Sequence, residues 1–252
     1  DDFLNLNWKM KIVFQILFVS FPIFLLNQTI NFEILFGINF SGRLNYVLTI
    51  LWILVLMNSI NFIDNMDGFA AINSSFICIA LTALSFVFNQ NYLADVSFVL
   101  LFSILGFTIY NFPPARIYMG DSGSLFIGFI FGFISILFDW NPTGQSYLYS
   151  SIAPIFLFFT IPLLDFSTVF IHRIKNNISP TTGGTDHISH RLLNQGLSVK
   201  SVLLLFSLLN IFIFLLLALT IAFESMSVII FLIYLIIILT LFIKFQKLEP
   251  LN

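Results

Sequence analysis

The sequence is short of charge and of cysteine. Charged residues make up 9% of the 252 residues, against about 25% in an average soluble protein. Cys78 is the only cysteine and lies inside an apolar run, which excludes an intrachain disulfide and a thiolate metal site. The ten basic residues leave no extended basic surface, so we expect no nucleic acid partner. Hydrophobic residues supply 59% of the chain and the mean hydropathy is +1.02, so we expect an integral membrane protein in contact with membrane lipid.

Eight apolar runs are long enough to be membrane spans. A helix needs about 20 mainly apolar residues to cross a bilayer, since every backbone polar group must be bonded within the segment. The third and fifth runs carry Ser, Thr or Gly among large residues, which favours close helix packing. Because no repeat or soluble segment separates the runs, the predicted fold is an all-α polytopic membrane helical bundle, a single domain over residues 1–252. The predicted limits are 10–27, 44–60, 68–88, 95–111, 123–139, 148–165, 201–222 and 227–243.

Lysine and arginine concentrate in alternate connections between these runs. If the chain starts in the cytoplasm, nine of the ten basic residues lie on the cytoplasmic side and only Arg43 lies outside. The positive-inside rule therefore predicts a cytoplasmic start. Four polar segments then share the cytoplasmic face, which indicates one site there: 1–2, 58–68, 113–124 and 183–192.

The second predicted span ends in polar residues at a spacing of three: Asn58, Asn61, Asp64 and Asp67. Carboxylates at a membrane edge are energetically unfavourable, and by default they mark a functional site. The alternative is that these side chains cap helices and bind water at the interface. Asp165, at the end of the sixth predicted span, is interpreted as an interfacial residue.

Asp121 lies in the run MGDSGS, just before the fifth predicted span. An acid flanked by Ser and Gly at a helix start is also a good N-cap, which is one interpretation. The functional interpretation is a magnesium ligand, because Mg²⁺ is often held by one or two carboxylates together with waters and substrate phosphates. Backbone N–H groups at the start of a helix would favour a phosphate beside it.

The segment GGTDHISHRL carries two histidines and an arginine, at His187, His190 and Arg191. Zinc is not expected, since a zinc site needs a third or fourth protein ligand. We expect these side chains instead to donate hydrogen bonds to a developing phosphate charge, or to neutralise it. The alternative is a basic loop attracted to anionic lipid head groups. Asp1 and Asp2 form a further pair of carboxylates, for which disorder at the chain start is the alternative.

In combination, these motifs resemble the polyprenyl-phosphate N-acetylhexosamine-1-phosphate transferases, relatives of the transferase that makes the first lipid intermediate of peptidoglycan. NSINFIDNMDGFA, over 58–70, is similar to the Asn-rich DGxDG segment of that family. RIYMGDSGS, over 116–124, is similar to its MGDxGS segment, and DHISHRL, over 186–192, to its histidine loop. The resemblance begins at the Asp-Asp pair and covers essentially the whole chain. It implies that the chain is N-terminally truncated, with the first two or three spans of the family missing.

The resemblance implies a magnesium-dependent phosphoglycosyl transferase of the bacterial inner membrane with its active site in the cytoplasm. It would transfer an N-acetylhexosamine 1-phosphate from a UDP-N-acetylhexosamine to undecaprenyl phosphate and release UMP. The product would start a surface glycan, such as the O-antigen of lipopolysaccharide or a cell wall polymer. By similarity, the catalytic residues are Asp1, Asp2, His187, His190 and Arg191, the metal ligands are Asp121 and Asn61, and the substrate-binding residues are Asn58, Asp64, Asp67 and Arg116.

The chain departs from the family pattern at two positions. Asn65 stands where glycine is frequent, which would reshape the nucleotide contact, and Thr185 stands where close relatives often carry arginine, which affects sugar recognition. A membrane transporter and an inactive truncated scaffold of the same fold are the alternative functions. Direct attack by the lipid phosphate and a two-step route through an aspartyl phosphate both fit the sequence, and a homodimer is left open.

Overall fold

The computed structural model describes residues 7–30, 42–140, 155–179 and 183–250, and this part of the chain is helical without β-strands. Seven helices have the length and the apolar composition needed to cross a membrane. They are α1 (Trp8–Leu26), α3 (Gly42–Ile63), α4 (Phe69–Val87), α5 (Asn91–Asn111), α6 (Gly120–Leu137), α10 (Val199–Ala222) and α11 (Ser227–Lys247). The prediction of an all-α polytopic membrane bundle is therefore confirmed, and the protein is a multi-pass membrane protein.

Two shorter helices and one 3₁₀ turn complete the described part: α8 (Thr160–Lys175), α9 (Ile188–Asn194) and Glu224–Met226. The predicted sixth span at 148–165 is wrong in its limits, because α8 continues to Lys175. Its first part, 148–154, lies outside the described residues. Hydropathy ends a predicted span at the first charged residues, whereas this helix continues because Asp165 and Arg173 have partners in the chain.

Small residues let α3 and α6 pack closely. A Cβ atom added at Gly128 of α6 would lie 2.5 Å from the Cα atom of Met57, and one added at Gly132 would lie 2.9 Å from the side chain of Ile53. Close approach through small residues is the main way in which helices associate in a membrane. The prediction of close packing for the fifth span is therefore confirmed.

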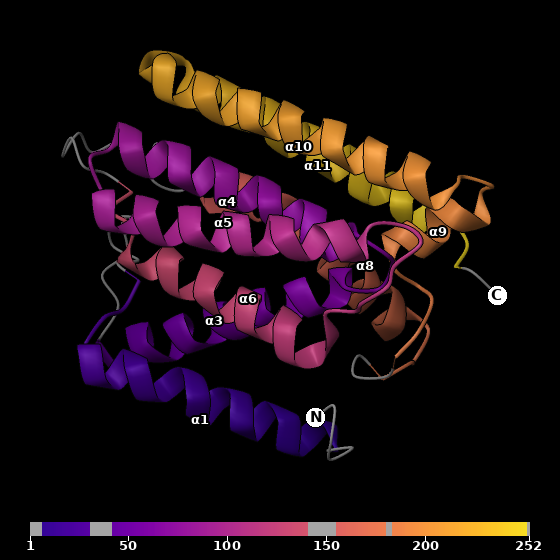
Figure 1. Cartoon of the computed structure of the whole chain (residues 1–252), viewed down its shortest axis with the longest axis horizontal. Helices are drawn as coiled ribbons and strands as arrows, with labels where there is room; N and C mark the ends of the chain where they lie inside the picture. The colour runs from indigo at the N-terminus through magenta and orange to yellow at the C-terminus, as the bar shows by residue number, and fades with distance from the viewer. Residues whose placement is uncertain (1–6, 31–41, 141–154, 180–182, 251–252) are drawn as a thin grey trace.

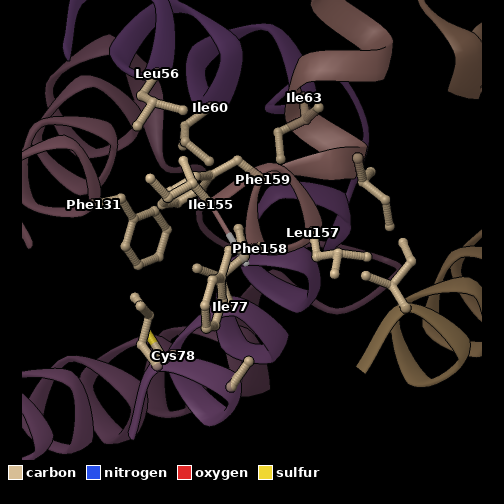
Figure 2. Packing of buried hydrophobic residues seen from close by; sticks show 14 of the residues in the cluster. Leu56, Ile60, Ile63, Ile77, Cys78, Phe131, Ile155, Leu157, Phe158 and Phe159 are labelled. Atoms are coloured by element: carbon tan, nitrogen blue, oxygen red, sulfur yellow. The ribbon is translucent and has the colours of Figure 1, made fainter. Parts of the chain in front are cut away.

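Bulky residues fill the space beside this contact. Figure 2 shows Leu56 and Ile60 of α3 and Phe131 of α6 pointing toward Phe159, which precedes α8. The rings of Phe131 and Phe159 lie 6.1 Å apart, and all four side chains are buried. Since α3 takes part in both contacts, its last turn is fixed relative to α6 and α8.

The polar motifs collect at one end of the bundle. Each of the helices α3, α4, α5 and α6 runs antiparallel to the one before it, so the α3–α4 and α5–α6 connections lie at the same end of the bundle (Figure 1). The start of α1, the short helix α9 and the end of α11 lie at that end too, on the right in Figure 1. The end of α8 and the start of α10 flank α9 in the chain, and together with them these connections and helix ends hold nine of the ten basic residues. Arg43 lies at the start of α3, at the opposite end.

Candidate functional site

Asn61 and Asp121 bring two of the motifs into direct contact. Asn61 lies in the last turn of α3 and Asp121 in the first turn of α6. The Asn61 amide donates hydrogen bonds of 2.9 Å to the Asp121 carboxylate and of 2.9 Å to the Ser124 hydroxyl. Asp121 makes no N-cap hydrogen bond, because the N-cap residue of α6 is Met119. The interpretation of Asp121 as an N-cap is therefore wrong.

Lys11 of α1 approaches the same carboxylate. Its ammonium lies 3.1 Å from Asp121, and the two side chains are each 34% exposed. Three helices far apart in the sequence thus meet at Asp121. Lys11 was not predicted as a site residue, although Lys9 and Lys11 stand out as two cations at the start of an apolar run.

Asp64 follows α3 directly and lies close enough to Asp121 for their charges to interact. Burial and, to a smaller extent, the negative charge of Asp121 together raise the pKa of Asp64 to about 7, against a hydrogen bond from the Gly120 backbone that lowers it. Two carboxylates of this kind disfavour each other's ionisation. A cation between them would remove that repulsion.

Asp67 and Gly68 join the α3–α4 connection to the α5–α6 connection. The Asp67 carboxylate accepts a 2.9 Å hydrogen bond from the Ala115 backbone N–H. The Gly68 N–H donates to the Asn111 side chain at 3.0 Å, and Gly68 has a φ of +74°, where a residue with a Cβ atom is strained. One carboxylate oxygen of Asp67 therefore holds the loop that leads to Asp121.

Two hollows meet at Asn61 and Asp121. The acidic cavity has a volume of about 370 Å³, and its polar lining includes Asn61, Asp64, Asp67 and Asp121. The apolar groove has a volume of about 310 Å³ and runs between α1, α3, α6 and α8. Its lining includes Lys11, Asn58, Asn61 and Asp121 at polar positions and Leu51, Leu54, Val55, Phe62, Leu125, Phe166 and Phe170 at apolar ones.

Two predicted substrate-binding residues lie apart from the acidic cavity. The Asn58 amide lies in the apolar groove and donates to the Gln15 side chain at 3.1 Å. Arg116 is exposed on the α5–α6 connection, and its backbone N–H donates to the Tyr110 carbonyl oxygen at 2.8 Å. Arg116 lines neither of the two hollows. The predicted pair Asp1 and Asp2 lies outside the described residues.

The histidine segment packs against the α3–α4 connection. His190 Nε2 lies 2.9 Å from the Asn65 carbonyl oxygen, and the Ser189 hydroxyl donates to the Asn65 side chain. The His187 and His190 rings are 6.0 Å apart, and His187 Nδ1 lies 2.8 Å from the Asp165 carboxylate. The structure thus connects His190 to the acidic cavity through Asn65, which lines it, and His187 to the cavity only through His190.

Arg191 occupies a different position from the one expected of a phosphate ligand. It is fully buried and donates to the backbone carbonyl oxygens of Asp186 and Leu248, with a longer contact to that of Phe245. These contacts tie the histidine segment to the end of α11. Among the described residues they give Arg191 a packing role, and its catalytic role stays a prediction.

A buried ion pair holds the start of the histidine segment. The Arg173 guanidinium donates two hydrogen bonds, of 2.8 and 2.7 Å, to the Asp186 carboxylate. Burial by itself would raise the pKa of Asp186, but the hydrogen bonds and the charge of Arg173 outweigh it and lower the pKa below its usual value. The forked pair is specific to a planar guanidinium.

Oxygen ligands at this end of the bundle suit a hard cation. No group of three or more His, Cys, Asp or Glu side chains that could hold a metal occurs within the described residues. Asp121, Asn61 and Asp64 nevertheless supply oxygen atoms around the acidic cavity. Mg²⁺ accepts such a partial set because it keeps several waters and binds substrate phosphates.

Comparison with known proteins gives matches along most of the chain. The family model described as glycosyl transferase family 4 matches residues 1–139. A probable undecaprenyl-phosphate N-acetylglucosaminyl 1-phosphate transferase of Bacillus subtilis (strain 168) is 34% identical over 197 residues, which cover 78% of this chain and 54% of that protein. A decaprenyl-phosphate N-acetylglucosaminephosphotransferase of Mycobacterium leprae (strain TN) is 33% identical over 174 residues, 63% of this chain and 44% of that protein.

A third relative covers more of the chain at lower identity. The undecaprenyl-phosphate alpha-N-acetylglucosaminyl 1-phosphate transferase of Thermotoga maritima is 28% identical over 217 residues, 84% of this chain and 64% of that protein. The chain thus spans about half the length of the first two relatives and nearly two thirds of the third. The resemblance to the polyprenyl-phosphate sugar-phosphate transferases is confirmed: the chain belongs to glycosyl transferase family 4.

Proposed function

We propose that this protein transfers an N-acetylhexosamine 1-phosphate from a UDP-N-acetylhexosamine to undecaprenyl phosphate, with release of UMP. The observation that carries the proposal is that the acidic cavity and the apolar groove share Asn61 and Asp121. The reaction joins a charged, water-soluble donor to a phosphate on a long apolar chain. Two hollows of opposite character that meet at a carboxylate fit this pair of substrates.

The acidic cavity suits the magnesium complex of the donor diphosphate. Asp121 and Asn61 would hold the metal, with Asp64 and Asp67 on the nucleotide side. Burial and the charge of Asp121 raise the pKa of Asp64 to about 7, and a divalent cation would offset both effects by stabilising the ionised carboxylate. When bound, the metal supplies neutralisation of phosphate charge, which is the main requirement of phosphoryl transfer.

The apolar groove suits the polyprenyl chain, and its polar end suits the lipid phosphate. Aromatic and aliphatic side chains of α3, α6 and α8 line the groove, and Lys11 lies at the end where Asp121 is. The Lys11 ammonium would attract a phosphate and hold it next to the donor. This positioning favours direct in-line attack on the β-phosphate of the nucleotide sugar. Asp1 and Asp2 remain the proposed groups that orient or deprotonate the lipid phosphate.

The site would face the cytoplasm of a bacterium. The end of the bundle that carries the motifs also carries nine of the ten basic residues, and such an excess marks the cytoplasmic side. The product would start a surface glycan, either an O-antigen or a cell wall polymer. A transporter is less well supported, because transport sites lie near the middle of the bilayer, whereas these polar groups gather at one end.

The test is release of UMP from a UDP-N-acetylhexosamine in the presence of undecaprenyl phosphate and Mg²⁺. We expect Asp121→Asn to lower turnover by at least about 100-fold, in line with the loss of one group that stabilises transition-state charge. Asp95→Asn is the matched control, since Asp95 is exposed in α5 at the opposite end of the bundle. Turnover that survives Asp121→Asn would contradict the metal assignment, and a phospho-enzyme trapped without lipid would contradict direct attack.

A further inference from the structure

Asp165 and His187 form a buried pair that the sequence analysis did not connect. Asp165 lies in α8 and is 1% exposed. One carboxylate oxygen lies 2.8 Å from His187 Nδ1, and the other accepts a 2.7 Å hydrogen bond from the Ile188 backbone N–H. An ionised carboxylate can only accept, so the pair assigns the proton of the imidazole to Nδ1. Within the described residues His187 Nε2 makes no hydrogen bond.

Helix α8 holds the histidine segment at a second point. Arg173 follows Asp165 by just over two helical turns, so the two side chains lie on the same face of α8. Arg173 binds the Asp186 side chain, and Arg191 binds the Asp186 carbonyl oxygen at 2.8 Å. The backbone on the N-terminal side of His187 is therefore fixed by contacts other than the Asp165 pair.

The His187 ring contacts neighbours that connect it to both hollows. It packs edge-on against Phe62, with the ring centroids 5.4 Å apart, and Phe62 lines the apolar groove. The His190 ring, whose centroid lies 6.0 Å from that of His187, in turn contacts Asn65 of the acidic cavity. A fixed imidazole in this position has one nitrogen left for a substrate.

We propose that Asp165 is a positioning residue, which holds His187 in the tautomer protonated at Nδ1 and so keeps Nε2 as an acceptor for a substrate O–H group. If Nε2 takes up the proton of such a group, the positive charge of the imidazolium is stabilised by the Asp165 carboxylate. The inference rests on the proposed transferase function for the substrate. The arrangement of Asp165 and His187 stands independently of that function.

The variant Asp165→Asn tests the tautomer directly. The Ile188 N–H needs an oxygen acceptor, so the asparagine would turn its oxygen to Ile188 and its NH₂ group to His187 Nδ1. Nδ1 would then accept, and the proton would move to Nε2. We expect ¹⁵N spectra of the side chains in detergent micelles to show an Nδ1–H imidazole in the wild type and an Nε2–H imidazole in Asp165→Asn. Loss of one signal in His187→Gln assigns the residue among the three histidines.

Activity is the second measurement. We expect Asp165→Asn to lower kcat for UMP release by about 100-fold or more, in the range of a lost general acid or base. In the His187→Gln background the same substitution should have no further effect, which a merely structural Asp165 would not produce. Asp165→Glu, which keeps two acceptor oxygens, should recover part of the rate.

The outcomes separate this inference from the proposed function. If the wild type releases no UMP but shows the Nδ1–H tautomer, the function fails and the positioning pair stands. If the wild type is active and Asp165→Asn keeps its rate, or if the wild type shows an Nε2–H imidazole, the inference is overturned. Should Asp165→Asn not fold, the wild-type spectrum still decides the tautomer.

Discussion

The side-chain amide of Asn61 lies 2.9 Å from the carboxylate of Asp121, although 60 positions separate the two residues. The contact joins the last turn of α3 to the first turn of α6 at the end of the bundle where the basic residues gather. The two hollows that the proposed reaction needs meet at this contact.

Asp64→Asn is expected to stabilise the metal-free protein at high pH. The folded-state pKa of Asp64 is about 7 and its ordinary value is 3.8, so ionisation in the folded state is unfavourable. Stability then falls as pH rises between these values, and it stays low above pH 7. Thermal unfolding in detergent should give a Tm a few degrees above the wild type at pH 8, with a smaller difference at pH 5. Asp95→Asn serves as control, and a difference that is independent of pH would contradict the argument.

Magnesium should reduce the difference in Tm between Asp64→Asn and the wild type. A cation between Asp64 and Asp121 offsets the repulsion between the carboxylates. We therefore expect Mg²⁺ at pH 8 to raise the Tm of the wild type more than that of Asp64→Asn. An equal rise in both proteins would place the cation elsewhere.

Val55→Trp is expected to block the apolar groove. Val55 lines the groove one helical turn before Asn58, so an indole there would occupy the space assigned to the polyprenyl chain. The KM for undecaprenyl phosphate should rise by about 10-fold, the equivalent of about 1.4 kcal/mol of binding, while the KM for the UDP-sugar stays within twofold. Ala83→Trp, in a separate apolar hollow beside α10, is the matched control. A change in the KM of the UDP-sugar alone would contradict the assignment of the groove.

Arg173→Met is expected to destabilise the protein by about 3–5 kcal/mol, because it leaves the buried Asp186 carboxylate without its partner. The double variant Arg173→Met with Asp186→Leu should recover part of this loss. The lowered pKa of Asp186 means that the pair stabilises the wild type above pH of about 4 and that this contribution is lost as pH falls further. Thermal unfolding from pH 3 to 7 measures both effects, and a single variant as stable as the wild type would contradict them.

Asn65→Gly restores the residue that is frequent in the family and should loosen the histidine segment. It removes the hydrogen bond from the Ser189 hydroxyl and the 2.6 Å bond from the Asn65 amide to the Phe62 carbonyl. We expect faster amide hydrogen exchange over 186–191 and a loss of about 1 kcal/mol for each hydrogen bond. Ser103→Ala is the control, since Ser103 is exposed and its hydroxyl donates to the Val99 carbonyl oxygen, four residues earlier in the same helix. Unchanged exchange over 186–191 would show that Asn65 does not hold the segment.

Hydropathy predicted most of the fold. Seven of the eight predicted spans correspond to membrane-length helices, because a long apolar run has few alternatives to a helix in lipid. The remaining predicted span, the sixth, corresponds in part to α8 and shows the limit of this reasoning. Helix α8 carries charged residues, and Asp165 and Arg173 there are bound by Ile188 and Asp186 of the histidine segment, outside α8.

Motifs identified part of the candidate site. Asn61, Asp64, Asp67 and Asp121 were selected because acids at a membrane edge are unfavourable without a function, and the structure brings them to one cavity. Lys11 and Asp165 were missed, since a lysine at the start of a span and an aspartate at the end of one are ordinary interfacial residues in a sequence. Their importance depends on Asp121 and His187, which are distant in the chain.

The sequence by itself determined that the protein is a helical membrane bundle of glycosyl transferase family 4 with its polar motifs on alternate connections. These properties depend on local hydrophobicity and on short motifs, both of which are written along the chain. Only the tertiary structure decided that Lys11 reaches Asp121, that Asp165 fixes His187, and that Arg191 is buried against α11. Such contacts depend on the distance and the rotation between packed helices, which the packing of all their side chains sets together.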